Sequence, residues 1–441
     1  MMHDTRPPSP GGAPTTLNKV AITPTRMSAG AGAWVAIAIF AQESVWNFYE
    51  AQVPAQLRGY LSSATLIGLI MGMDTAFGVF VQPVMGRFSD LRARHRFGRW
   101  PIIVAGACLA AIPFTLIPWA TSLPALMMCV VCFGLTANAF KGVTETLVSD
   151  YVAAGNRSKA QGFIKAGVSL TIVVSSLISL LVVDHSLKAA FAIPPLVMLI
   201  AIGLASWFPG RDHARRRLPA QDEAEPDAAA HGLDESASSW AVIKDVVRDP
   251  SRSRLLMVGI FCFAGMWSAL RAMTTPYGIE VLGMSRGQAG AIALPGAIAF
   301  LIAVVPIAYL SSRVGQVRAI RRGVALFVAG LLTGFAAPNA SMTAAAMAIS
   351  SVGYAVFAVN ALVALVALWN LAPNDRVLGA YTGLYTIASA SGISLGPALL
   401  GITMDLTGWR SMLLNAAVFA AITFAVFTSL ARRTAASART A

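Results

Sequence analysis

The chain has 441 residues, of which 56% are hydrophobic and 12% are charged. Soluble domains carry about 25% charged residues. A water-soluble fold could not bury so much apolar surface, so lipid must be the solvent for most of it. This excludes a water-soluble enzyme and an intrinsically disordered chain. The net charge of +13 comes from basic residues in short clusters between apolar runs, a pattern typical of membrane topology rather than of nucleic-acid binding.

Apolar runs of about twenty residues, the length that crosses a bilayer, form two sets of six. The first set lies near Gly32–Pro54, Ser63–Val84, Pro101–Ala120, Leu123–Thr146, Ala160–Val183 and Ala189–Phe208. The second set lies near Leu255–Pro276, Gln288–Leu310, Val317–Phe335, Met342–Leu368, Leu378–Gly401 and Arg410–Leu430. We therefore predict an all-α membrane protein with twelve transmembrane helices in two six-helix bundles.

The polar segments divide the chain into five parts. Residues 1–30 are a predicted disordered tail, 31–208 the first bundle, 209–250 a charged linker, 251–431 the second bundle and 432–441 a second tail. Arg and Lys cluster in alternate loops, whereas the opposite loops hold single basic residues, namely Arg58, Lys188, Arg286 and Arg410. By the positive-inside rule, both tails and the linker lie in the cytoplasm, and we expect a multi-pass protein of the inner (cytoplasmic) membrane.

The two halves are related by an internal repeat. One shared offset of 222 positions places Pro54 on Pro276, Ser63 on Ser285, Gly68 on Gly290, Ser89 on Ser311 and Asn138 on Asn360. The shared offset and the matching span boundaries predict parallel bundles related by an axis along the membrane normal, with a central cavity between them.

A basic segment from Gly86 to Pro101 joins the second and third spans. We expect Gly86 to allow a close approach of two helices, and Asp90 to cap the following turn and pair with a nearby Arg. The segment either only fixes topology or acts as a latch that stabilises one state of a rocking transporter. The candidate latch residues are Gly86, Asp90, Arg94, Arg96, Gly98 and Arg99.

This segment resembles the cytoplasmic signature of the major facilitator superfamily. Its end, Arg96-Phe-Gly-Arg-Trp-Pro101, is similar to the branch of glycoside–pentoside–hexuronide:cation symporters and plant-sucrose-carrier-like proteins. Further stretches similar to that branch are Asn47–Pro54, Leu61–Gly68, Ala139–Asp150 and Gly379–Tyr385, with Gly396, Pro397 and Asp405. The chain departs from the branch at Lys141 and Val143, and the second-half segment 311–318 lacks the acid. The resemblance implies a secondary transporter that works by alternating access.

Charged residues inside the predicted spans are the strongest functional signal, because each costs about 2.5–3.5 kcal/mol at a helix centre and normally faces a cavity or another charge. They are Glu43, Glu50, Asp74, Lys141, Glu145, Lys165 and Arg271. Glu43, Trp46, Asn47 and Glu50 share one helix face. An aromatic ring, an amide and two carboxylates on one face suit a sugar, whose ring stacks while its hydroxyls form hydrogen bonds. Snorkelling to the interface is the alternative for Glu50 and Lys165.

Asn138, Lys141 and Glu145 share a second face, where Lys141 and Glu145 form an i,i+4 pair that is either structural or functional. Four acids against three bases leave one carboxylate without a fixed partner. A desolvated carboxylate of this kind can bind a proton near neutral pH. We predict proton coupling through Glu43 or Asp74, with Lys141 and Glu145 exchanging partners as the bundles rock. Sodium coupling through the same carboxylates is the alternative.

The second half adds candidates for solute contact. Arg271 shares a face with Trp267 and Thr274 and either binds an anionic solute or anchors the helix at the interface. Tyr381 and Tyr385 form a stripe that either contacts a ligand or packs. The predicted solute-binding set is Trp46, Asn47, Glu50, Asn138, Arg271, Asn360, Tyr381 and Tyr385.

Three functions fit these observations. The first is import of a sugar or glycoside by cation symport, with a proton as the favoured cation. The second is proton-coupled export of drugs or metabolites, which the same fold supports. A non-transporting sensor or assembly protein is disfavoured by the cost of the buried charges. The sequence has no GxxxxGK[ST] loop and no clustered His/Cys/Asp site. We therefore expect no enzyme, cofactor or metal, but a monomer in the lipid bilayer whose partners are a small solute and a coupling cation.

Overall fold

The computed structural model describes residues 29–93, 95–151, 154–211, 252–314, 316–369 and 378–440, and the regular structure in these ranges is helical. The first half contains α1 (Ala29–Arg58), α2 (Ala64–Arg92), α3 (Trp100–Leu116), η1 (Ile117–Trp119), α4 (Leu123–Tyr151), α5 (Ala154–Ile178), the π-helical turn η2 (Ser179–Val183) and α6 (Leu187–Arg211). The second half contains α9 (Arg252–Glu280), α10 (Arg286–Gly290), α11 (Leu294–Val314), α12 (Gln316–Ala336), α13 (Ala340–Trp369), α14 (Leu378–Thr407), η4 (Trp409–Ser411) and α15 (Met412–Thr440).

The helices have the length and composition of membrane spans. Among the described residues, ten helical segments are long and apolar enough to cross a bilayer by themselves. One of them runs from Arg286 to Val304 and so joins α10 to α11 in a single crossing. The remaining two predicted crossings are α1, which carries Glu43 and Glu50, and α5. The predicted fold class, an all-α membrane protein with two six-helix halves, is confirmed.

The internal repeat appears in the way two helices begin. Ser63 is the N-cap of α2 and its hydroxyl accepts a hydrogen bond from the Leu66 amide at 3.3 Å. Ser285 is the N-cap of α10 and accepts from the Gln288 amide at 3.2 Å. A capping hydroxyl satisfies one of the free N–H groups of the first turn. Equivalent serines therefore start equivalent helices in the two halves.

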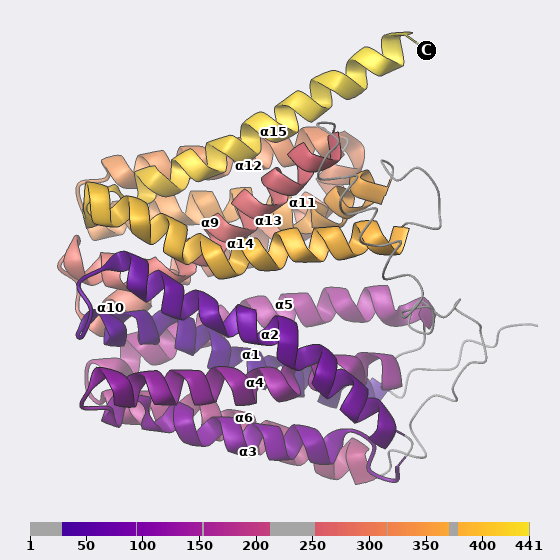
Figure 1. Cartoon of the computed structure of the whole chain (residues 1–441), viewed down its shortest axis with the longest axis vertical. Helices are drawn as coiled ribbons and strands as arrows, with labels where there is room; N and C mark the ends of the chain where they lie inside the picture. The colour runs from indigo at the N-terminus through magenta and orange to yellow at the C-terminus, as the bar shows by residue number, and fades with distance from the viewer. Residues whose placement is uncertain are drawn as a thin grey trace, which may run out of the picture.

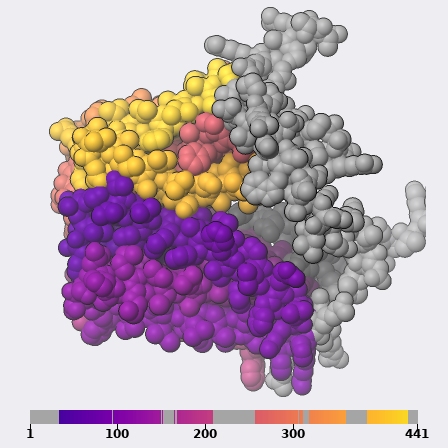
Figure 2. Space-filling view, in the orientation of Figure 1, coloured from indigo at the N-terminus to yellow at the C-terminus, as the bar shows by residue number. Residues whose placement is uncertain are grey.

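The two halves form two layers with roughly parallel helix axes, with α1–α6 in one layer and α9–α15 in the other (Figure 1). We term the end with the turns at 59–63, 184–186, 281–285 and 408–411 the distal end. The first residue of α1 and the last residue of α15 lie at the opposite, proximal end. On the face shown in Figure 2, the two halves meet directly over the distal part of the molecule.

The boundary between the halves, termed the seam, is tightest where α2 lies beside α14 (Figure 1). A Cβ atom added to Gly68 would overlap the backbone of Pro397, and one added to Gly72 would overlap the backbone of Ser394. Small residues at such positions let two helix backbones touch. The Ser394 hydroxyl also donates to the Gly72 carbonyl oxygen at 2.9 Å.

The close helix approach expected at Gly86 is absent among the described residues, where an added Cβ atom would meet nothing within 4 Å. The contact-making glycines of α2 lie further toward its distal end. The predicted tail 432–441 continues α15 as a helix as far as Thr440, through an Ala-rich stretch. Residues 1–28 of the predicted tail 1–30 and residues 212–250 of the predicted linker 209–250 lie outside the described residues.

Candidate functional site

Glu43 on α1 and Lys141 on α4 form an ion pair inside the first bundle. Glu43 Oε1 lies 2.8 Å from Lys141 Nζ, and the side chains are 15% and 26% exposed. Lys141 Nζ also lies 5.3 Å from the ring centre of Trp46, within range of a cation–π interaction. Lys141 therefore has Glu43 as its partner in place of the predicted Glu145, which is exposed. A neighbouring helix supplies a closer carboxylate than Lys141's own helix does.

A second ion pair crosses the seam. Arg271 Nη2 on α9 binds both Glu50 Oε2 and Asn47 Oδ1 on α1. The amide nitrogen of Asn47 donates to Thr171 Oγ1 on α5 at 2.5 Å and to the Glu43 carbonyl oxygen at 2.9 Å. Arg271, whose role the sequence left open, thus joins the second bundle to two helices of the first. Glu50 lies in an ion pair between the bundles.

Asp74 on α2 is half-buried, and its bonding partners differ from those of Glu43 and Glu50. Its Oδ1 accepts from the Thr75 amide at 2.6 Å and from the Thr75 hydroxyl at 3.3 Å. It lies within electrostatic range of Glu50 and Lys141. In the part of the chain that the structure describes, no basic side chain forms an ion pair with Asp74.

Asn138 on α4 is occupied by contacts within the first bundle. Its amide nitrogen donates to the backbone carbonyl oxygens of Asp74 at 2.9 Å and Gly134 at 2.8 Å, and its Oδ1 accepts from Gln82 at 2.9 Å. One amide hydrogen bond joins α4 to α2 through Asp74, and the other returns to Gly134 within α4, so both donors are used. This geometry gives Asn138 a packing role and leaves the predicted solute contact without a free donor.

Several predicted side chains lie outside the described set, namely Lys165, Asn360, Tyr381 and Arg94. Tyr385 on α14 is half-buried and packs against the hydrophobic core.

A stacked aromatic pair in the second bundle was not predicted. Trp267 on α9 and Tyr354 on α13 stack with ring centres 3.5 Å apart and planes 4° apart. Trp267 lies one turn before Arg271 on α9, and Tyr354 is within electrostatic range of both Arg271 and Glu50. In the sequence, Trp267 is marked only by the helix face that it shares with Arg271, and no sequence spacing links it to Tyr354 on another helix.

Arg99 is the centre of the predicted latch, at the proximal end of the first bundle. Its Nη1 donates to Ser89 Oγ at 2.5 Å and to Asp90 Oδ1 at 2.7 Å, and its Nε donates to Asp150 Oδ2 at 3.2 Å. Gly98 has φ 54°, which favours glycine and turns the chain into α3. The sequence points to Asp150 only through the family resemblance, because 51 residues separate it from Arg99.

The predicted latch residue Arg96 takes no part in the Arg99 network that the structure describes. It is exposed, and its guanidinium carbon lies 5.3 Å from the ring centre of Phe97. This contact stays within the turn between α2 and α3.

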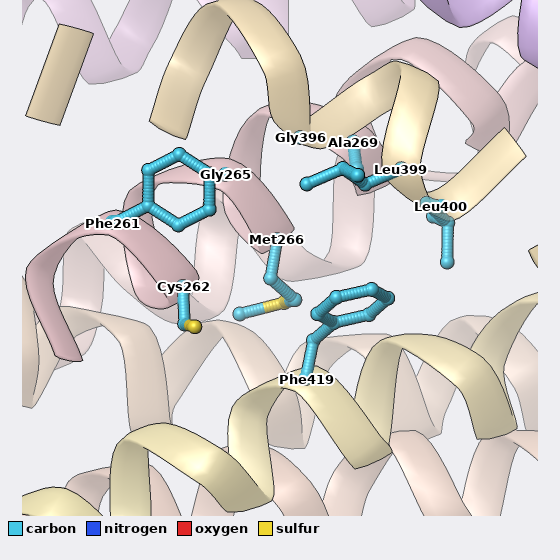
Figure 3. A pocket seen from close by; sticks show the side chains of 9 residues that line it. All are labelled: Phe261, Cys262, Gly265, Met266, Ala269, Gly396, Leu399, Leu400 and Phe419. Atoms are coloured by element: carbon cyan, nitrogen blue, oxygen red, sulfur yellow. The ribbon is translucent and has the colours of Figure 1, made fainter. Parts of the chain in front are cut away.

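An apolar pocket lies between α9, α14 and α15, apart from the charged residues (Figure 3). Met266 and Phe419 point into it, and the Cys262 thiol lies at its edge. Gly265 and Gly396 form one wall, where the two helix backbones touch. Its lining offers no charged group, so the pocket does not extend the polar site.

The fold and the charged residues together define a polytopic membrane protein of two repeated helical bundles with ion pairs between and within them. The sequence matches the model of the Major Facilitator Superfamily over residues 27–369 and again over 282–441. The chain belongs to this family of transporters.

Individual relatives are distant. The chain is 25% identical to the tetracycline resistance protein, class H, of Pasteurella multocida over 182 residues, which is 41% of this chain and 44% of that protein. It is 24% identical to the multidrug resistance protein MdtH of Aeromonas hydrophila over 160 residues, 34% of this chain and 39% of the relative. The matches thus span less than half the length of these curated relatives.

Solved structures share the fold over nearly the whole chain. The nucleoside transporter NupG superposes with a TM-score of 0.70 at 13% identity, covering 90% of this chain and 98% of that one. A bacterial homologue of the lysosomal transporter Spinster, in an inward-facing conformation, gives 0.69 at 16% identity, with 92% and 98% covered. At such identities the likeness shows the fold alone.

Proposed function

We propose that this protein moves a small polar solute across the inner membrane together with a proton, by alternating access of its two bundles. The observation that carries the proposal is the distribution of ion pairs. Glu43 and Glu50 each bind a basic side chain, whereas Asp74 binds none among the described residues. A carboxylate of this kind can take up and release a proton without first breaking an ion pair.

The position of Asp74 supports a link between the proton and the bundle movement. Asp74 lies two residues after Gly72, where α2 touches the Ser394 backbone of α14 across the seam. Asn138 also holds the Asp74 carbonyl oxygen against α4. A change of charge at Asp74 therefore acts on a helix that is tied to the first bundle on one side and packed against the second on the other.

Unsatisfied polar groups on α1 support a solute rich in hydroxyl groups. Gln42 Oε1, Trp46 Nε1 and Tyr49 Oη are buried without a hydrogen-bond partner among the described residues. Their i, i+4, i+7 spacing places them on one helix face, and buried polar groups normally have partners. A sugar or glycoside would supply both donors and acceptors. Together with the resemblance to sugar:cation symporters, this makes sugar symport the first candidate.

Proton-coupled efflux is the second candidate. The names of two relatives favour it, since both are resistance proteins. Symport and efflux by antiport differ in the direction of the proton relative to the solute. Addition of a transported solute outside liposomes makes the outside more alkaline in symport and more acidic in antiport.

The test uses the full chain in proteoliposomes. A panel of sugars and glycosides and a panel of cationic drugs are offered under an imposed pH gradient or an imposed sodium gradient, and external pH is recorded with a dye. We expect proton-driven accumulation of one sugar-like solute. Accumulation that follows only the sodium gradient would contradict proton coupling.

A matched pair of variants tests Asp74. Asp74→Asn should abolish accumulation against a gradient but retain solute exchange, because the binding residues are unchanged. Glu145→Gln removes an exposed carboxylate on α4 and should retain accumulation. Full proton-driven accumulation by Asp74→Asn would overturn the role of Asp74.

A further inference from the structure

The distal end carries three acidic residues, and each of them bonds to the opposite bundle. They are Asp184 at the end of η2, Glu280 at the end of α9 and Asp405 near the end of α14. Two of the four basic residues at this end, Arg58 and Arg286, also bond across the seam. Such concentration of charge in cross-bundle contacts is unlike an ordinary loop surface, where charged side chains mostly face water.

Asp405 of the second bundle caps the first turn of α2 in the first bundle. Its Oδ1 accepts from the Ala64 amide at 2.7 Å, and its Oδ2 accepts from the Thr65 amide at 3.1 Å. Oδ2 also accepts from the hydroxyls of Ser63 and Thr65, each at 2.6 Å. A carboxylate at a helix N-terminus is stabilised by the free N–H groups and by the helix dipole.

Asp184 of the first bundle makes the corresponding contact with the second. Its Oδ2 accepts from the Ser285 hydroxyl at 2.6 Å, and its Oδ1 accepts from the Gly287 amide at 2.8 Å, in the first turn of α10. Ser63 and Ser285 are equivalent positions of the repeat. The two halves therefore exchange acidic caps in a nearly two-fold arrangement.

Arg58 and Glu280 complete the arrangement. Their side chains form an ion pair with Arg58 Nε 2.9 Å from Glu280 Oε1, and the two residues are 222 positions apart. This is the offset of the internal repeat, so equivalent positions of the two halves meet each other. Two equivalent positions can touch only close to the axis that relates the halves.

We propose that Asp184, Asp405 and the Arg58–Glu280 pair form a gate that holds the distal end closed, and that all three contacts break when the bundles separate there. The helices lose little when the gate opens, because Ser63 and Ser285 still cap them with their own hydroxyls. The two aspartates therefore stabilise the closed arrangement rather than the helices themselves. With the termini in the cytoplasm, as the Arg and Lys pattern predicts, the gate faces the outside.

The test measures the separation of the bundles directly, independently of transport. Spin labels are placed at Thr121, between η1 and α4 of the first half, and at Ser341, in the first turn of α13 in the second half. Both residues are exposed and take no part in the gate. The full chain, with its native cysteines replaced, is reconstituted in lipid nanodiscs. Pulsed electron paramagnetic resonance then gives the distribution of label distances.

In the labelled protein without gate substitutions, we expect one short distance between the two labels to dominate. Asp405→Asn and Asp184→Asn should each shift the ratio of long to short distances on the order of tenfold, as expected for loss of charge-assisted hydrogen bonds. The double variant should shift it further. Lys188→Gln is the matched control, because Lys188 lies at the same end but contacts Trp119 of its own bundle, and it should leave the distances unchanged.

An unchanged distance distribution in Asp184→Asn/Asp405→Asn would overturn the gate. So would an equal shift in Lys188→Gln, since it would trace the effect to charge at this end in general. If the double variant fails to fold, Asp405→Asn alone tests the gate, and its ratio of long to short label distances should again shift on the order of tenfold. None of these outcomes depends on the solute or on proton coupling.

Discussion

The interior of the first bundle and the seam between the bundles both contain ion pairs, but the pairs differ in exposure. In the interior, the side chains of Arg99 and Asp150 are 8% and 6% exposed, whereas Asp90, the second acid on Arg99, lies at the edge of the interior and is 65% exposed. At the seam, those of Arg58 and Glu280 are 22% and 36% exposed. The same order holds near the middle of α1, where the interior pair with Lys141 is less exposed than the seam pair with Arg271.

This difference suits the two kinds of contact to different tasks. Removing one partner of a buried pair leaves a desolvated charge and costs several kcal/mol, whereas breaking a solvated pair costs about 0–1 kcal/mol. Interior pairs join helices that move together, so they can remain formed throughout a transport cycle. In the proposed alternating-access cycle, seam pairs break each time the bundles separate, and their partial exposure lowers the free energy that this step requires. Interior substitutions should therefore change fold stability, and seam substitutions should change the balance between conformations.

The largest effect on transport is expected at the α2–α14 contact, where the two backbones touch. Gly68→Val puts a branched side chain into the Pro397 backbone, so α2 and α14 cannot close against each other. Transport in proteoliposomes should fall at least about tenfold. The unfolding temperature in detergent should change little, because the bundles can remain apart at this point.

Gly86→Ala is the control on the same helix, since a Cβ atom there meets nothing within 4 Å in the part of the chain that the structure describes. It should leave both transport and unfolding temperature unchanged. A fall in transport equal to that of Gly68→Val would mean that α2 is sensitive along its whole length rather than at the seam.

The next largest effect is on fold stability. It compares two basic residues, on α4 and α9, whose acidic partners lie near the middle of α1. Lys141→Met removes the interior partner of Glu43 and should lower the free energy of unfolding by about 2–3 kcal/mol. Arg271→Met removes the seam partner of Glu50. This pair is somewhat more exposed than the Lys141 pair, but Glu50 Oε2 itself is buried, so the loss should be smaller, about 1–2 kcal/mol. Thermal unfolding in one detergent measures both, and equal losses would remove the distinction between interior and seam.

Much of the fold could be predicted from the sequence, because span length and hydropathy are local properties. The offset of 222 that separates Arg58 from Glu280 also marked Ser63 and Ser285 as equivalent, and both proved to be N-caps. Partner choice could not be predicted in the same way. Lys141 binds Glu43 on another helix, and that choice depends on how two helices are rotated and staggered, which no sequence spacing records.

The gate at the distal end was missed for the same reason. In the sequence, Arg58 is only a lone basic residue in a loop, and only the family resemblance marks Asp405. Their contacts join residues 222 and more than 300 positions apart. The close approach expected at Gly86 has a related explanation. A sequence shows that a glycine allows close packing, but not whether a second helix lies beside it, and among the described residues none does. The signal available in retrospect is the repeat itself, because equivalent positions near its axis must meet.

A smaller difference in the free energy of unfolding is expected between variants of the two acids that bind Arg99. Asp150→Asn alters a carboxylate that is 6% exposed, and Asp90→Asn alters one that is 65% exposed. We expect a loss of about 1–3 kcal/mol for Asp150→Asn and about 0.5 kcal/mol for Asp90→Asn. Urea or thermal unfolding of the detergent-solubilised protein gives both values. A larger loss for Asp90→Asn would show that burial does not decide the strength of interior pairs.

The smallest effect is expected at Arg96, which neighbours the interior network but does not belong to it. Its guanidinium contacts the Phe97 ring at 5.3 Å, and both side chains are exposed, so Arg96→Ala should lower the free energy of unfolding by about 0.5 kcal/mol or less. Arg99→Lys is the comparison, because lysine keeps the charge but cannot bind Asp90 and Asp150 with a planar fork. If Arg96→Ala destabilised the protein as much as Arg99→Lys, the stabilising interior would extend into the exposed turn. Exposure would then no longer separate the contacts that hold a bundle together from those that release at the seam.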